Sequence, residues 1–328
     1  MGAAHPTPQP AGRRRALITG GAGFIGSHLA EALLAARCDV TIVDNLSTGR
    51  RENLPPGARF IEADLGAWLP RAPCDYHEVY HLAAAVGVKL VIDDPITAIE
   101  HNVGDTAALL RWAAAAAIPP AVLVASSSEV YGKSERVPFS ENDDVTYGPT
   151  SVGRWSYAYG KALDEYLALG HASRGLPVVV ARFFNTVGPR QVGTYGMVVP
   201  RFVAAALRGE PLRVFGDGAQ SRCFCDVRDV APALPRLLRA PAAAGRVFNV
   251  GSDRSITIQA LAELVIRQTG SRSGIIHVPF EQAYASGFED LLRRQPDLAR
   301  IREAIGFAPA IPLEQTIRDI AGAGVAQT

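Results

Sequence analysis

The sequence predicts an α/β fold in which a doubly wound parallel sheet is joined to a smaller, interleaved C-terminal lobe. Short apolar runs alternate with Ala- and Leu-rich stretches through the first half of the chain, a pattern typical of parallel strands and the helices that cover them. A glycine-rich turn follows the first apolar run, and the alternation weakens after Asn185. At 328 residues, the chain is long enough to bury a large core.

The expected elements of the first half alternate between strand and helix. Strands are predicted over the short apolar runs 15–19, 40–44, 59–62, 78–82, 121–126 and 177–183. Helices are predicted over 25–36, 96–117 and 155–173. In the second half, helices are expected over 198–208, 227–239, 256–269 and 313–321, and the strand-like run 247–250 can belong to either lobe.

The first strand runs into a G-x-x-G-x-x-G turn at 20–26, and a helix follows. Gly20 allows the tight turn, Gly23 lets the backbone approach a phosphate, and Gly26 lets the helix pack closely on the strand. Anionic oxygens then lie at the helix N-terminus. The turn therefore predicts a site for the pyrophosphate of a dinucleotide.

Asp44 ends the second strand, roughly 20 residues beyond the glycines, where an acid is expected on a ribose diol. A carboxylate there repels a 2′-phosphate, and Asn45 rather than an arginine follows it. NAD is therefore favoured over NADP, in a Rossmann domain over 13–183. Residues 1–12 are expected to form a disordered extension, and 184–328 a substrate-binding lobe from which some segments return to the first domain.

Composition excludes several function classes. The 33 basic and 32 acidic residues leave a formal charge of +1, so neither nucleic acid nor a membrane surface is an expected partner. The N-terminal extension has no apolar core of a signal peptide, and no apolar run is long enough to span a bilayer. The four cysteines form no paired framework, which favours a reduced, cytoplasmic setting. Cys223 and Cys225 are interpreted as packed thiols, and no metal is expected.

Tyr157 and Lys161 are the candidate catalytic pair. Their i, i+4 spacing places both side chains on one face of the third helix. The ammonium is expected to lower the pKa of the phenol, so that Tyr157 can act as a base at neutral pH. Ser127 follows a strand whose carboxyl end faces the expected ligand site, and its hydroxyl can share the substrate's proton. His81, at the end of an apolar strand, is interpreted as a structural histidine.

The chain resembles the extended short-chain dehydrogenase/reductases, specifically the NAD-dependent nucleotide-sugar epimerases, dehydratases and decarboxylases. The resemblance extends from Arg15 to about Ile320. The matching motifs are T-G-G-A-G-F-I-G at 19–26, V-D-N at 43–45, A-D-L at 63–65, H-L-A-A at 81–84, S-S-S-E-V-Y-G at 126–132, Y-x-x-x-K at 157–161, F-F-N-T-V-G-P-R at 183–190, Q-S-R at 220–222 and R-x-P-D at 294–297.

The resemblance implies roles for individual residues. Tyr157 is the base, Ser127 its hydrogen-bonding partner, Lys161 the ligand of the nicotinamide ribose, and Glu129 a further catalytic candidate. The dinucleotide is expected to contact Gly20, Gly23, Phe24, Ile25, Gly26, Asp44, Asn45, Asp64, Leu65, Leu82, Ala83, Ala84, Tyr157 and Lys161. The nucleotide sugar is expected to contact Ser128, Asn185, Thr186, Arg190, Val199, Phe215, Arg222 and Arg294; guanidinium groups suit its diphosphate.

The implied chemistry begins with oxidation of the sugar at C4, after which three reactions compete. A 4,6-dehydratase is disfavoured because Ser128 stands where those enzymes carry an aspartate. Decarboxylases of UDP-glucuronate share S-x-E-V-Y-G and R-x-P-D with this chain but usually differ around 155–160 and 191–197. We therefore expect a UDP-glucuronate 4-epimerase, with Ser128, Thr186 and Arg190 as partners of the carboxylate.

Other readings stay open at this point. These are UDP-glucuronate decarboxylation, epimerisation of a neutral UDP-hexose, and a non-catalytic protein that only binds the dinucleotide. Glu129 is a puzzle for any uronate, since a second carboxylate near the first costs energy unless it is protonated or turned toward Tyr131 or a water. The resemblance also implies a homodimer formed through the helices at 96–117 and 155–173.

Overall fold

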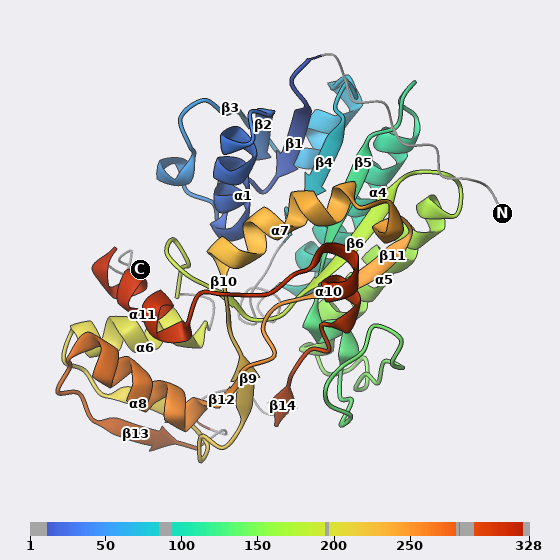
Figure 1. The fold of residues 1–328 in the computed structure, drawn as a ribbon. Helices are drawn as coiled ribbons and strands as arrows, with labels where there is room; N and C mark the ends of the chain where they lie inside the picture. Colours follow the sequence, from blue (N-terminus) through green and yellow to red (C-terminus); the bar gives the residue numbers. More distant parts are fainter. Residues whose placement is uncertain (1–11, 85–93, 194–196, 280–281, 283–291, 324–328) are drawn as a thin grey trace.

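A computed structural model describes residues 12–84, 94–193, 197–279, 282 and 292–323. Its centre is a parallel seven-stranded sheet with the order β11-β6-β5-β4-β1-β2-β3 (Figure 1). The strands are β1 (Arg15–Thr19), β2 (Asp39–Asp44), β3 (Arg59–Glu62), β4 (Glu78–His81), β5 (Ala121–Ser127), β6 (Val178–Phe183) and β11 (Arg246–Val250). The predicted doubly wound α/β fold is confirmed.

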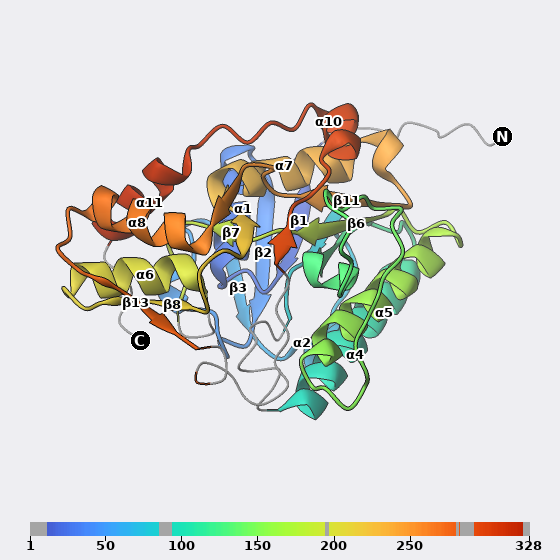
Figure 2. The same ribbon diagram turned by 90° about the horizontal axis from the view of Figure 1, so that it is seen from below.

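Helices cover both faces of this sheet, as Figure 2 shows. On one face lie α1 (Phe24–Ala35), α7 (Val227–Arg239) and the short α10 (Ala299–Ile305). On the other face lie α4 (Pro95–Ala114) and α5 (Trp155–Ala172), with α2 (Leu65–Trp68) beside α4. Both faces of the central strands are therefore buried, which explains why β1, β4 and β5 are almost continuously apolar.

The first six predicted strands and all seven predicted helices are present, with ends that differ by at most a few residues. The run 247–250 belongs to the main sheet, because β11 pairs with β6 from Arg246 onward. Since α7 also packs on α1, the chain beyond residue 184 returns twice to the first domain. We therefore propose that the two lobes share the second half of the sequence rather than dividing it at one boundary.

The second lobe is built around three helices: α6 (Val198–Leu207), α8 (Ile258–Thr269) and α11 (Leu313–Gly322). Short strands that the sequence did not predict surround them: β8 (Leu212–Phe215) with β13 (Ile275–Val278), β9 (Ser221–Cys223) with β12 (Ser255–Thr257) and β14 (Arg293–Arg294), and β7 (Thr186–Val187) with β10 (Cys225–Asp226). These strands are only two to four residues long, too short for a periodic signal. Single turns η1 (Arg51–Asn53), η2 (Leu69–Arg71), η3 (Ser128–Tyr131) and η4 (Pro241–Ala243) complete the described elements.

Other expectations can be compared with the structure. All four cysteines are free thiols, and Cys223 and Cys225 are buried. Among the described helices, none is both long and apolar enough to cross a membrane. The predicted disordered extension lies, apart from its last residue, outside the described residues.

Candidate functional site

A cavity of about 760 Å³ opens at the carboxyl ends of the sheet strands and extends to the second lobe. Every residue that the sequence proposed for catalysis, dinucleotide binding or sugar binding lines it. These residues come from β2, β5, α1, α2, α5, α6, β7, β8, β9, β14 and the single turn η3, or from the loops after β1, β2, β3, β4, β6 and β7. The structure thus brings the whole predicted set to one place, while the role of each residue stays a prediction.

The glycine-rich turn has the shape that a bound pyrophosphate requires. Gly20 has φ +71°, and a Cβ there would lie 2.7 Å from the backbone nitrogen of Ala83. A Cβ on Gly26 would lie 2.3 Å from the carbonyl oxygen of Gly20. Neither position has room for a side chain, so the turn stays tight and α1 begins directly behind it.

Asp44 is held rigidly at the end of β2. Its Oδ2 accepts from the backbone N–H of Ala22 at 3.0 Å, and its Oδ1 accepts from that of Leu46 at 2.8 Å. Next to it, Asn45 donates to Asp64 at 2.8 Å. A fixed carboxylate beside the glycine turn suits the ribose of NAD and opposes a 2′-phosphate, so the residues present fit this cofactor.

The candidate catalytic residues lie where β5 ends and α5 begins. The hydroxyl of Ser127 accepts from the backbone N–H of Glu129 at 3.2 Å and also interacts with the phenol of Tyr157. Lys161 donates to the carbonyl oxygen of Ala125 at 3.1 Å, which ties α5 to β5. The strand end and the helix therefore place hydroxyl, phenol and ammonium along one wall of the cavity.

The expected pKa of Tyr157 needs a correction. Burial raises the pKa of this phenol above its ordinary value, and the nearby ammonium of Lys161 lowers it by less than burial raises it. The carboxylates of Glu129 and Asp164 raise it further. The sequence identified the effect of Lys161 but not the desolvation of a phenol between a helix and a strand end.

Both carboxylate oxygens of Glu129 face guanidinium groups. Its Oε1 accepts from Arg294 at 2.6 Å, and its Oε2 lies 3.6 Å from the guanidinium of Arg154. Although burial raises the pKa of Glu129, Arg294, Arg154 and Arg222 together hold it below its usual range. The puzzle posed by a second carboxylate is resolved, because one carboxylate lies among three guanidinium groups.

Arg154 was not among the predicted site residues. It is buried, stacks over Trp155 with 5.2 Å between its guanidinium carbon and the ring centroid, and lines the cavity. A single arginine before a helix carries no pattern, so only its place beside Glu129 identifies it. Arg201, inside α6, was also missed; it lines the cavity and stacks 4.4 Å from the centre of the ring of the predicted Phe215.

Arg190 lies on the dinucleotide side of the cavity. Its guanidinium donates to Ser27 at 3.2 Å and pairs with Glu31, and both partners belong to α1. Its backbone has φ +72°, a left-handed conformation at the turn after β7. The predicted contact between Arg190 and a sugar carboxylate stays a prediction.

His81 has the structural role that the sequence suggested. It is buried between the hydroxyls of Thr19 at 2.8 Å and Thr106 at 3.1 Å. Burial, with a smaller contribution from the charge of Lys161, lowers the pKa of His81 to about 3. A neutral imidazole therefore connects the first strand to α4 behind the catalytic wall.

Residues 16–251 match the family model described as "NAD dependent epimerase/dehydratase family". The chain belongs to this family. Its cofactor is accordingly NAD, and the glycine turn and Asp44 described above are the residues that fit it.

Curated relatives are mainly named as decarboxylases. The chain is 42% identical to UDP-N-acetyl-alpha-D-glucosaminuronate decarboxylase of Bacillus cytotoxicus, over 94% of this chain and 96% of the relative. It is 34% identical to UDP-glucuronic acid decarboxylase 1 of Danio rerio, over 92% of this chain and 71% of the relative.

Two similar solved structures are described as epimerases. UDP-N-acetylglucosamine 4-epimerase from Methanobrevibacter ruminantium has a TM-score of 0.85 and 31% identity, covering 95% of this chain and 98% of that one. UDP-glucose 4-epimerase from Thermotoga maritima has a TM-score of 0.85 and 28% identity, covering 94% of this chain and 98% of that one. The names of these four relatives share a UDP-linked sugar, but two name a decarboxylase and two name a 4-epimerase.

Proposed function

We propose that the chain is an NAD-dependent decarboxylase of a UDP-linked hexuronate, with UDP-N-acetylglucosaminuronate and UDP-glucuronate as the candidate substrates. The observation that carries this proposal is the pairing of Arg294, from the R-x-P-D run, with Glu129 in the wall that also holds Tyr157. The 42% identity to a decarboxylase over nearly the full length of both chains supports it. Decarboxylation therefore replaces UDP-glucuronate 4-epimerisation as the preferred assignment.

The first step needs a base at the sugar C4 hydroxyl. Tyr157 accepts that proton in its phenolate form, which Lys161 and Ser127 favour against the effect of burial. Ser127 also hydrogen-bonds the same substrate oxygen, and Lys161 stabilises the negative charge. NAD held by the glycine turn and Asp44 would supply the hydride acceptor for C4 and, at the end of the reaction, the hydride donor. The oxidised sugar carries a ketone at C4, which is β to the C6 carboxylate.

The second step moves an electron pair away from the carboxylate. The C5–C6 bond breaks, carbon dioxide leaves, and the pair forms a C4–C5 double bond with negative charge on O4. An ionised Glu129 beside the substrate carboxylate raises the free energy of the starting state, whereas Lys161 lowers that of charge on O4. A proton from solvent then adds to C5, and the proton held by Tyr157 returns to O4.

A 4-epimerase is the second candidate. The same first step produces the same ketone, and rotation of the sugar before hydride return inverts C4 without loss of carbon dioxide. The 28–31% identical epimerase structures favour this reading, as do the differences from decarboxylases around 155–160 and 191–197. The identity of the product distinguishes decarboxylation from 4-epimerisation.

The purified protein should be incubated separately with UDP-N-acetylglucosaminuronate and with UDP-glucuronate. The sugar nucleotides are then separated, and their masses are measured by mass spectrometry. We expect loss of carbon dioxide to a UDP-pentose, abolished by Tyr157→Phe. A second UDP-uronate of unchanged mass would identify the epimerase instead. Absence of conversion, with UDP-glucose also unchanged, would support a protein that only binds the dinucleotide.

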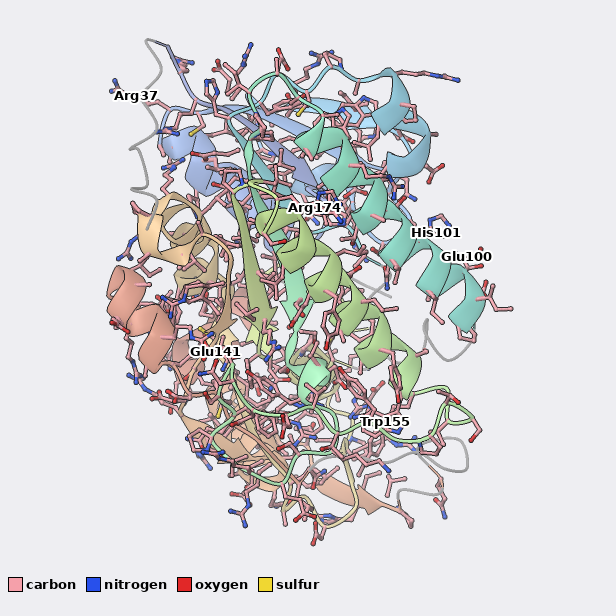
Figure 3. All side chains as sticks on the ribbon, turned by 90° about the vertical axis from the view of Figure 1, so that its right-hand side faces the viewer. Arg37, Glu100, His101, Glu141, Trp155 and Arg174 are labelled. Atoms are coloured by element: carbon pink, nitrogen blue, oxygen red, sulfur yellow. The ribbon has the colours of Figure 1, made fainter. Side chains whose placement is uncertain are left out.

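We also propose a homodimer formed through α4 and α5, which lie side by side on one face of the molecule in Figure 3. Ile99 and Ile96 of α4 are 41% and 69% exposed, and Leu163 and Tyr166 of α5 are 49% and 76% exposed. A second copy of the same helix pair would bury these side chains in a two-fold interface.

A further inference from the structure

Asp164 is a fully buried carboxylate that the proposed mechanism does not yet use. It lies on α5 one turn beyond Lys161, and its Oδ2 accepts from the Lys161 ammonium at 3.0 Å. The side chains of Asp164 and Lys161 are 0% and 4% exposed. Two opposite charges are therefore removed from water directly behind the catalytic wall.

This pair determines how the ammonium is oriented. A lysine ammonium has three N–H donors. Among the described residues, the carbonyl oxygen of Ala125 and the carboxylate of Asp164 account for two of them, one from β5 and one from α5. The remaining donor is the one that a ligand in the cavity can use, since Lys161 also lines that cavity.

The pair also determines whether the ammonium keeps its charge. Burial alone lowers the pKa of Lys161, and a fully buried lysine can lose its proton near neutral pH. Asp164 is the main neighbour that opposes burial, with smaller contributions from Tyr157 and Glu165, and the pKa of Lys161 is raised as a result.

We propose that Asp164 is a positioning residue of the active site: it keeps the Lys161 ammonium charged and directed at the cavity, and so sets the pH range in which Tyr157 works as a base. The proposal rests on the proposed roles of Tyr157 and Lys161 in oxidation at C4, and it holds for decarboxylation and epimerisation alike. It assigns a function to the carboxylate that lies behind the Y-x-x-x-K motif.

Other charged and titratable groups surround these three side chains. Tyr157 is influenced by Glu129, and Glu129 is itself paired with Arg294 and Arg154.

On the other side, Lys161 interacts with neutral His81 of β4 and more weakly with Glu165. Glu165 is neutralised by two hydrogen bonds from Arg182 of β6, so it adds little net charge. Burial raises the pKa of Asp164, while Lys161 and the Thr106 side chain on α4 favour its charged form. Asp164 is thus the acidic group that acts most directly on Lys161.

Asp164→Asn keeps an oxygen that can accept from Lys161 but removes the charge. At pH values where Lys161 keeps its proton, the pKa of Tyr157 should then fall, because one of the carboxylates that raise it is gone. The pKa of Lys161 should also fall, because burial is no longer opposed by its main partner. Both limbs of the pH profile of kcat/KM should therefore move to lower pH.

Two measurements test this prediction in the full-length protein. The first is the pH dependence of kcat/KM for whichever UDP-sugar the protein converts. The second needs no substrate and follows the ultraviolet absorbance of tyrosinate as a function of pH. The titration of the Tyr157→Phe protein is subtracted from that of the protein with Tyr157, once for the wild type and once for each Asp164 variant. Asp144→Asn removes an exposed carboxylate and is the matched control, with both limbs expected at the wild-type pH.

The expected result is a lower ionisation pH of Tyr157 in Asp164→Asn, with wild-type behaviour restored in Asp164→Glu even if kcat stays reduced. A uniform loss of activity at all pH values, with an unchanged phenolate titration, would overturn the proposal and leave Asp164 a purely structural group. If Asp164→Asn does not fold, the pH profile of kcat/KM of Asp164→Glu is the test. The proposal predicts that both limbs of that profile stay at the wild-type pH, and a shifted profile would contradict it. Failure of the function assignment would instead be seen in the identity of the product.

Discussion

At the scale of single residues, the environment of Glu129 is the feature that bears most directly on the reaction. Arg294, Arg154 and Arg222 outnumber this carboxylate, so the local charge suits the diphosphate of a nucleotide sugar. The ionised state of Glu129 is also what the proposed electron movement requires. The sequence supplied Glu129 and Arg294 as separate motifs, and only their 2.6 Å contact joins them.

We expect Glu129→Gln to lower kcat for carbon dioxide release about 100-fold, while oxidation at C4 slows far less, because the carboxylate acts on the second step. The measurement is a single turnover in which dinucleotide absorbance reports oxidation and trapped carbon dioxide reports decarboxylation. Arg294→Lys, which keeps the charge but not the planar fork, is the companion variant. Equal slowing of both steps by Glu129→Gln would contradict this assignment.

For Arg190, the contacts with Ser27 and Glu31 indicate a role near the dinucleotide. We expect Arg190→Leu to reduce retention of NAD by about tenfold or more, since a charged hydrogen bond beside the glycine turn is lost. The ratio of affinities for UDP-glucuronate and UDP-glucose should stay constant. A selective loss of UDP-glucuronate affinity would instead support the carboxylate contact predicted from the sequence.

At the scale of elements, α5 is fastened to the sheet by a buried ion pair. Arg182 of β6 donates to both oxygens of Glu165 at 2.8 and 2.7 Å, and Ser126 of β5 donates to the same carboxylate at 2.5 Å. The helix that carries Tyr157 and Lys161 is thereby fixed against the two strands that form the cavity wall. Removing one member of such a pair leaves an uncompensated charge in the interior.

We expect Glu165→Gln to lower the free energy of unfolding by about 3–5 kcal/mol, measured by urea denaturation. Glu100→Gln, on the exposed outer surface of α4 (Figure 3), is the control and should change it by less than about 0.5 kcal/mol. A loss below about 1 kcal/mol in Glu165→Gln would show that the pair does not hold α5.

At the scale of the whole molecule, the site exists because two lobes meet over the carboxyl ends of the strands. The first lobe supplies the glycine turn, Asp44 and the Tyr157–Lys161 pair, and the second supplies Phe215, Arg222 and Arg294. We therefore propose that the dinucleotide and the nucleotide sugar approach each other from opposite sides of one cavity. The outer surface formed by α4 and α5 is left for the proposed dimer.

Tyr166→Glu should convert the dimer to a monomer, because it places a charge at the centre of an apolar interface. Analytical ultracentrifugation measures the outcome directly. Leu207→Glu, which adds the same charge at a 48% exposed position on α6, should leave the dimer intact. A monomeric wild-type protein, or a dimer that survives Tyr166→Glu, would exclude this interface.

The sequence by itself determined the order of strands and helices in the first half, the glycine turn with Asp44, and many of the residues that share the cavity, although not Arg154 or Arg201. These are local or periodic signals: helical period, glycine spacing, and the position of polar residues at strand ends. Tertiary structure decided that β11 and α7 return to the first lobe, that Arg154 lies beside Glu129, and that Asp164 is buried against Lys161. It also reversed the expected pKa of Tyr157. Each of these depends on burial or on partners distant in the chain, and desolvation and ion pairing arise only once the folded elements have excluded water.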